Sequence, residues 1–114
     1  MQDFATDPRS HSQDFTMHKQ VKGIADLLRP ELLRLDKGSD GDCGNRQLYV
    51  SFVQEVKSIR KEVTNSDALF TFRSILNHMS KVIVLTDNKA CHQEVLWHLQ
   101  EVMSLLFRLQ NLPS

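Results

Sequence analysis

Apolar side chains recur at spacings of three and four residues in four separate segments of this chain. That spacing places the apolar groups of each segment on one side of an α-helix, where they can be buried together. The four stripes are Met17, Val21, Ile24, Leu28, Leu32 and Leu35; Leu48, Phe52, Val56, Ile59 and Val63; Leu69, Phe72, Leu76, Met79 and Ile83; and Cys91, Val95, Leu99, Val102, Leu106 and Leu109. The pattern predicts an all-α fold.

Proline interrupts the first stripe at Pro30. A proline inside a helix removes one backbone donor and crowds the preceding turn, at a cost of about 3 kcal/mol. We therefore expect the first helix to be kinked or split at Pro30, with a break favoured and Pro30 in the first turn of the second piece. The sequence thus predicts a small antiparallel bundle of four to five helices.

Several polar residues mark the expected helix boundaries. Residues 1–13 carry no apolar stripe and are predicted to be a disordered N-terminal tail, followed by a single bundle domain over 14–112. Asn45 is a candidate N-cap for the second helix, and the polar residues 64–67 combine a turn with a cap. The third and fourth helices are expected over about 68–85 and 89–110. Because only short links join the last three helices, they should be antiparallel neighbours.

The charge balance bears on the class of partner. Fourteen basic and fourteen acidic residues give a formal net charge of zero, whereas non-specific binders of nucleic acid usually carry a positive excess. Lys57, Arg60 and Lys61 form a basic patch on the expected solvent side of the second helix. A nucleic-acid-associated protein that uses this patch is one alternative function. Glu55 and Glu62 dilute the patch, so we interpret it as a solvated helix face.

No motif in the sequence predicts a metal or cofactor. The segment beginning at Asp36 has carboxylates at two positions of a calcium-binding loop, but Gly38 supplies no side-chain oxygen at the third position and Gln47 stands where a bidentate glutamate is required. His92 and His98 are six residues apart and therefore lie on different faces of a helix. We interpret His78, His92 and His98 as surface or boundary histidines.

Catalytic motifs are equally lacking in the sequence. There is no nucleophile elbow, no P-loop and no glycine-rich phosphate loop. Cys91 fits the apolar stripe of the last helix, which favours a buried, inert thiol, and a thiol enzyme built on it is a weaker alternative. We therefore expect a protein that is not an enzyme.

Two helices carry more apolar groups than their stripes require. The additional side chains are Trp97, Leu105, Phe107 and Leu112 on the last helix and Phe70 on the third. A helix that is apolar nearly all round either lies at the centre of a bundle or is covered by another chain. We favour a partner-binding face, with a homodimer through the last helix as its simplest form. A fragment of an α-helical repeat scaffold is a further alternative.

The sequence also suggests a compartment. Two cysteines are too few for a disulfide scaffold, and the N-terminal residues lack the basic and apolar regions of a secretory signal. The longest apolar run covers only Val82–Leu85, far short of a membrane span. We expect an intracellular protein, cytoplasmic or nuclear, that does not enter the membrane.

Overall fold

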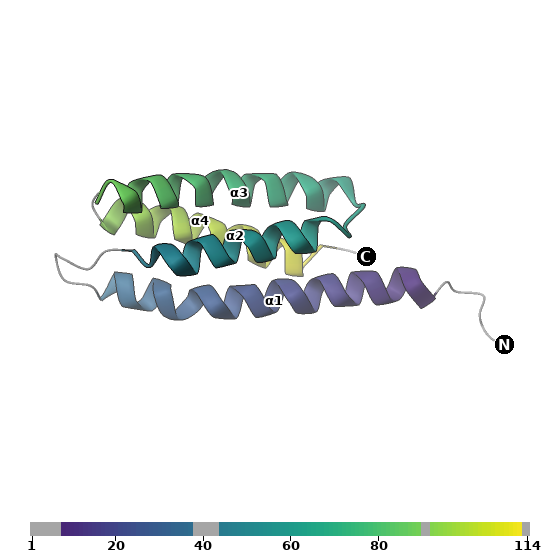
Figure 1. The fold of residues 1–114 in the computed structure, drawn as a ribbon. Helices are drawn as coiled ribbons and strands as arrows, with labels where there is room; N and C mark the ends of the chain where they lie inside the picture. The colour runs from purple at the N-terminus through teal and green to yellow at the C-terminus, as the bar shows by residue number, and fades with distance from the viewer. Residues whose placement is uncertain (1–7, 38–43, 90–91, 113–114) are drawn as a thin grey trace.

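The computed structural model describes residues 8–37, 44–89 and 92–112, which form four α-helices (Figure 1). The helices are α1 (Pro8–Asp36), α2 (Arg46–Arg60), α3 (Ser66–Asp87) and α4 (His92–Gln110). No strand occurs among these residues. The predicted all-α fold is confirmed. None of the described helices is both long enough and apolar enough to cross a membrane.

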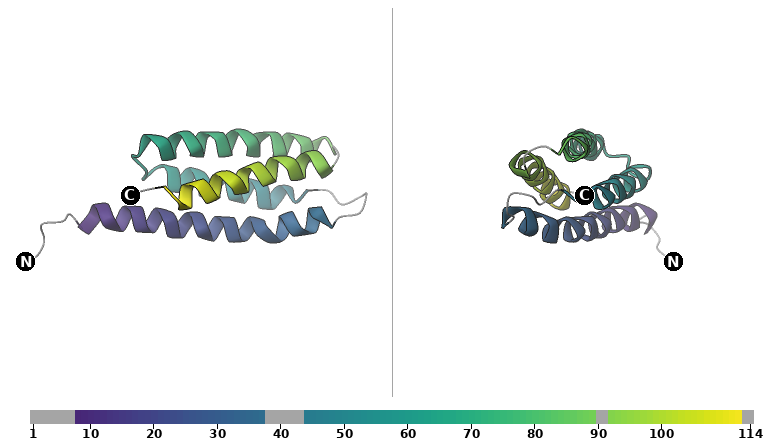
Figure 2. Two further views of the ribbon diagram at one scale, coloured as in Figure 1. Left: turned by 180° about the vertical axis from the view of Figure 1, so that it is seen from behind. Right: turned by 60° about the vertical axis from the view of Figure 1, so that its left-hand side comes forward.

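Each helix packs against two others, so that the four close around a common core. Helix α1 contacts α2 and α4, and α3 contacts the same two helices, with the α3–α4 contact the most extensive. Successive helices run in opposite directions, and a view toward the bundle end shows them enclosing the core (Figure 2). No helix occupies the centre. Contact between the first and last helices also differs from the open stacking of helical repeats.

The apolar stripes supply the buried core, but the buried side of α3 is rotated relative to its predicted stripe. In α3 the buried side is centred on Phe72, Ile75 and Met79, whereas the predicted stripe placed Leu69 on it; Leu69 is exposed. The apolar residues of α3 form two adjacent stripes, and contact with both α2 and α4 selects between them. The buried apolar residues are Val21, Ile24, Ala25, Leu28, Leu35, Tyr49, Phe52, Val56, Ile59, Ala68, Phe72, Ile75, Met79, Val82, Val95, Leu99, Val102, Leu106 and Leu109.

The expected break at Pro30 is wrong, because α1 continues through this residue as a single helix. Pro30 cannot donate to the carbonyl of Asp26, yet both residues are exposed, so water can bond that carbonyl. The Asp26 carboxylate also pairs with Lys22 at 3.5 Å and Arg29 at 2.9 Å. These pairs, together with the burial of Leu28 and Leu35 on either side of Pro30, favour one helix over two.

Helix α1 also begins earlier than the sequence indicated. The predicted tail ended at residue 13, but the backbone is helical from Pro8. Proline is well suited to a first helical turn, where its missing N–H has no intrahelical partner to lose. Residues 8–13 carry no apolar stripe, so periodicity had no signal there. Residues 1–7 lie outside the described part of the chain.

Two asparagines cap α2 and α3: Asn45 as expected, and Asn65 within the segment 64–67 that was predicted to combine a turn with a cap. The Asn45 side chain accepts a hydrogen bond from the Leu48 N–H at 3.1 Å, and Asn65 accepts one from the Ala68 N–H at 3.0 Å. Between α3 and α4 the chain turns through Lys89, which has a positive φ of 54°. The boundaries that rest on local polar chemistry are therefore well predicted.

Gly44 lies in close contact with the packed end of the bundle just before α2. A Cβ at this position would come within 2.7 Å of the Tyr49 ring and hydroxyl and within 2.8 Å of the Thr86 hydroxyl. Tyr49 is fully buried, so its ring has no free space to move into. Only glycine lets the chain pass this close to Tyr49.

We predict that Gly44→Ala lowers the free energy of unfolding by about 1–3 kcal/mol, because the added methyl group displaces Tyr49. Gly23→Ala is the matched control, since nothing lies within 4 Å of its Cβ position. At this helical site alanine should stabilise the protein by about 0.5–1 kcal/mol. Urea denaturation of both variants measures the difference. Equal effects at the two glycines would contradict the proposed contact with Tyr49.

Candidate functional site

Two aromatic side chains project from the side of α4 that faces away from the core. Trp97 is 53% exposed and Phe107 is 67% exposed. They belong to a stripe of exposed residues that we call the outer face of α4: Gln93, Trp97, Gln100, Ser104, Phe107 and Asn111. Leu105 and Leu112, predicted to join this surface, are only partly buried and pack against the core. The apolar surplus of α4 is therefore divided between the core and the surface.

Phe70 is 68% exposed but belongs to α3. It lies near the beginning of α3, and Trp97 lies near the beginning of α4. Because the two helices run in opposite directions (Figure 1), the beginning of α3, which carries Phe70, and the end of α4, which carries Phe107, lie at the same end of the bundle, and Trp97 lies toward the other end. The other large apolar side chains exposed among the described residues are Leu27, Leu33, Leu69 and Val84. The five predicted partner-binding residues do not form one continuous patch.

Trp97 contacts two histidines that the sequence did not bring together. The Nδ1 atoms of His78 on α3 and His98 on α4 are 2.9 Å apart, a hydrogen bond in which one ring donates and the other accepts. The indole packs edge-on against His98, with centroids 4.9 Å apart, and lies 6.0 Å from His78. Periodicity within a single helix carries no signal for a contact between two helices, which is why the pair was missed.

The environment of His98 favours its neutral form. Burial lowers the pKa of His98 below its ordinary value of 6.5, and the nearby His78 and Lys81 lower it further. Glu94 and Glu101 act in the opposite direction but do not reverse the shift. His98 is therefore neutral at pH 7, as a histidine that shares one hydrogen bond with a second histidine should be.

A shallow groove of about 320 Å³ lies beside this histidine pair. It runs between the second half of α3 and the first half of α4. Its lining residues are Ser80, Lys81, Val84, Leu85, Glu94 and His98. Val84 and Leu85 provide apolar surface, whereas Lys81 and Glu94 place opposite charges along the groove. Such a surface suits an apolar side chain flanked by polar groups.

The predicted basic patch lies at the C-terminal end of α2. Lys57 and Arg60 are in the last turn of the helix and Lys61 is its C-cap, and all three are exposed. Cations at this end of a helix interact favourably with its dipole, which accounts for them without a ligand. Arg46, at the opposite end of α2, pairs instead with Asp87 on α3 at 2.7 Å.

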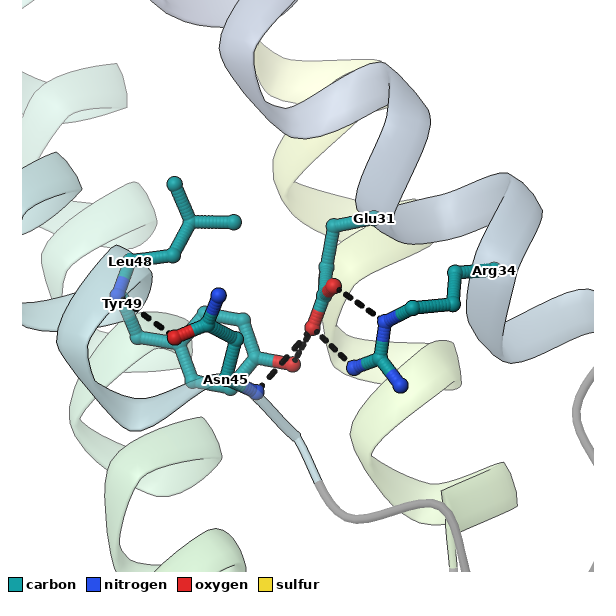
Figure 3. Close-up of polar contacts among 5 residues, drawn as sticks. All are labelled: Glu31, Arg34, Asn45, Leu48 and Tyr49. Atoms are coloured by element: carbon teal, nitrogen blue, oxygen red, sulfur yellow. Dashed lines mark hydrogen bonds and ion pairs between the residues drawn. The ribbon is translucent and has the colours of Figure 1, made fainter.

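Glu31 is the buried charged residue that holds α1 to the beginning of α2 (Figure 3). Arg34 donates two hydrogen bonds to its carboxylate, each of 2.9 Å. The Asn45 N–H donates a third at 3.1 Å, and the Tyr49 hydroxyl donates a fourth. Every carboxylate oxygen therefore has a donor, which is the condition under which a buried charge is tolerated.

These contacts make Glu31 a structural group rather than a catalytic acid. Burial by itself raises the pKa of Glu31, but the donors from Arg34, Tyr49 and Asn45 outweigh burial and hold the pKa below its usual 4.5. Burial and the adjacent Glu31 raise the pKa of Tyr49, so its hydroxyl remains a donor. The sequence contained a clue, because Glu31 falls on the apolar stripe between Leu28 and Leu35.

Within the described residues, no group of three or more histidine, cysteine or acidic side chains is arranged to hold a metal ion. Cys91 lies outside those residues, so its predicted burial stays a prediction. Comparisons of the chain with protein-family models, with curated protein sequences and with solved structures found no match. The site is therefore interpreted from the residues of this chain alone.

We predict that Glu31→Gln lowers the free energy of unfolding by about 1–3 kcal/mol at pH 7, because the amide cannot accept all four donors. The pKa of Glu31 is lower in the folded protein than in the unfolded chain. Its stabilisation is therefore present above about pH 4.5 and is lost as the pH falls through the folded pKa. The gap between wild type and variant should narrow on acidification. Urea midpoints at pH 7 and pH 3 test this, with exposed Glu55→Gln as control; a constant gap would contradict it.

We also predict that His78→Asn raises the pKa of His98 toward 6.5, because it removes the electrostatic interaction by which His78 lowers that pKa. Lys81→Gln should raise the pKa less, because Lys81 is the smaller cause. Since the pKa of His98 is depressed in the folded protein, its neutral form stabilises the fold above about pH 6.5, and that contribution is lost as the pH falls. NMR titration of the His98 ring measures the pKa; no change in either variant would refute the assignment.

Proposed function

We propose that this protein is a non-enzymatic interaction module that docks a partner protein through the outer face of α4. The observation that carries the proposal is the exposure of Trp97 and Phe107 on a helix whose opposite side is buried in the core. Aromatic side chains are enriched at protein interfaces relative to the rest of the surface, and tryptophan is enriched at binding hot spots.

Trp97 is held in position before any partner arrives. Its indole packs against His98 and His78 from two different helices. A side chain that is already ordered loses less conformational entropy on binding, so more of its contact energy appears as affinity. The burial of its exposed surface contributes about 25 cal/mol per Å² before the costs of association.

The polar neighbours of the two aromatics suit the rim of an interface. Gln100 and Ser104 lie between Trp97 and Phe107 on the outer face and can hydrogen-bond a partner or water. The groove beside His98 can receive an apolar side chain from the same partner. Nucleic-acid binding through Lys57, Arg60 and Lys61 remains the alternative, but α2 presents no exposed aromatic side chain on which a base could stack.

We predict that a photo-crosslinking benzophenone side chain at position 107, introduced in the cells that express the protein, forms a discrete protein adduct. The same group at Gln54, an exposed residue of α2, should give none, because α2 presents no exposed aromatic side chain there. Adduct formation is read by gel electrophoresis and mass spectrometry. Equal labelling at the two positions, or none at 107, would argue against docking through α4.

A stability measurement separates an interface residue from a core residue. Trp97→Ala should change the free energy of unfolding by less than about 1 kcal/mol, as expected of a side chain half in water. Phe72→Ala, at a fully buried site, should cost about 3–5 kcal/mol. If the two substitutions destabilise the protein equally, Trp97 belongs to the core and the docking role is lost.

A further inference from the structure

We propose that the protein docked on α4 is a second copy of this chain, packed antiparallel along the outer face; this rests on the docking function proposed above. The six residues of the outer face follow one another at intervals of four, three, four, three and four residues. This is the spacing of the seam positions of a two-stranded coiled coil, with Trp97 and Phe107 as its apolar members. All six are exposed and none is charged, so a second helix meets no charged group along the seam.

The seam reads nearly the same in both directions. Reversal about Val102 exchanges Gln93 with Asn111, Trp97 with Phe107, and Gln100 with Ser104. Each exchange replaces a residue by one of its own kind: amide for amide, aromatic for aromatic, and hydrogen-bonding side chain for hydrogen-bonding side chain. In a two-fold interface residue i of one copy contacts residue j of the other and j contacts i, so in this register each seam residue meets one of its own kind.

The geometry places Trp97 of each copy against Phe107 of the other. The two positions are ten residues apart, about 15 Å along the helix at 1.5 Å per residue. The two aromatic pairs therefore lie on either side of the symmetry axis, each burying surface that the single chain exposes. Between them, the small Ser104 lets the helices approach, and Gln100 of one copy can donate a hydrogen bond to Ser104 of the other.

Charges flanking the seam favour the same arrangement. Glu94, Glu101 and Arg108 follow at intervals of seven residues along one edge of the outer face. In an antiparallel pair this edge faces its own counterpart in reverse order. Glu94 then lies opposite Arg108 of the second copy, twice per dimer, and Glu101 lies opposite itself at the axis. Two attractive contacts accompany one repulsive contact.

A parallel pair lacks this charge match. It would set the charged edge against the other edge of the seam, where Leu96 and Met103 are partly buried and pack against their own core. The formal net charge of zero also means that two copies do not repel each other as whole molecules. The antiparallel pair of identical chains is therefore the occupant that these residues fit best.

Charge reversal tests the arrangement directly. Sedimentation of the purified full chain at low salt should show a concentration-dependent dimer. Glu94→Arg and Arg108→Glu should each raise its dissociation constant roughly tenfold, since each reversal creates two like-charge contacts. An equimolar mixture of the two variants should restore the dimer, because the arginine introduced in one variant then meets the glutamate introduced in the other. Failure of the mixture to associate more tightly than either variant alone would overturn the antiparallel pairing.

Further variants locate the contact. Trp97→Ala and Phe107→Ala should each raise the dissociation constant at least about tenfold, as hot-spot truncations do. Leu27→Ala is the control. Leu27 is 53% exposed, as Trp97 is, but it lies on α1, one turn from Glu31, and not on the outer face of α4. Glu101→Gln should strengthen the dimer by removing the repulsion at the axis. Weakening by Leu27→Ala equal to that by Trp97→Ala would place the interface elsewhere and refute the proposal.

The outcomes separate this inference from the broader docking function. A purified chain that stays monomeric at all concentrations, with an adduct to a different protein at position 107, overturns self-pairing and leaves docking through α4 in place. A monomer with no adduct overturns both. A dimer with the expected charge-swap behaviour, together with a self-adduct at position 107, supports both.

Discussion

The packing of α1 against both α2 and α4 is the constraint on which the rest of the structure depends. Without the α1–α4 contact, α1 and α4 would each pack against only one neighbour, and part of the buried side of each would face water. With that contact, every helix has a fully covered inner side and an outer side left to solvent. The exposure of Trp97 and Phe107 follows, because a closed four-helix arrangement has no central position that α4 could occupy.

The hydrogen bonds to Glu31 fix the register between α1 and α2, which apolar packing alone does not. Hydrophobic burial alone tolerates small slips and rotations between helices, whereas a buried carboxylate with donors from Arg34, Asn45 and Tyr49 is satisfied in one register. The same end of the bundle contains Gly44, where the chain passes against the Tyr49 ring. The position of the start of α2 therefore depends on the Glu31 carboxylate, on its hydrogen-bond donors and on Gly44, which has no Cβ.

The Glu31 cluster and the His78–His98 pair have different roles, because one is enclosed and the other lies at the surface. The Glu31 cluster is enclosed and fully paired, so it stabilises the fold and presents nothing to a ligand. The His78–His98 pair lies at the surface and supports the indole of Trp97, so it connects the α3–α4 contact to the exposed aromatic. Any partner bound at Trp97 therefore rests on a side chain whose position depends on two helices.

The sequence by itself determined the helical segments, the Asn45 cap and most of the core, because these depend on local spacing and local hydrogen bonding. It did not determine that α1 continues through Pro30, since the cost of proline depends on whether the unpaired carbonyl faces water. Nor did it determine that Leu105 and Leu112 pack inward while Phe107 points outward, or that His78 meets His98. Those outcomes were decided by tertiary structure, because they depend on which neighbour each helix face meets. The apolar pattern along one helix does not show which other helix it will pack against.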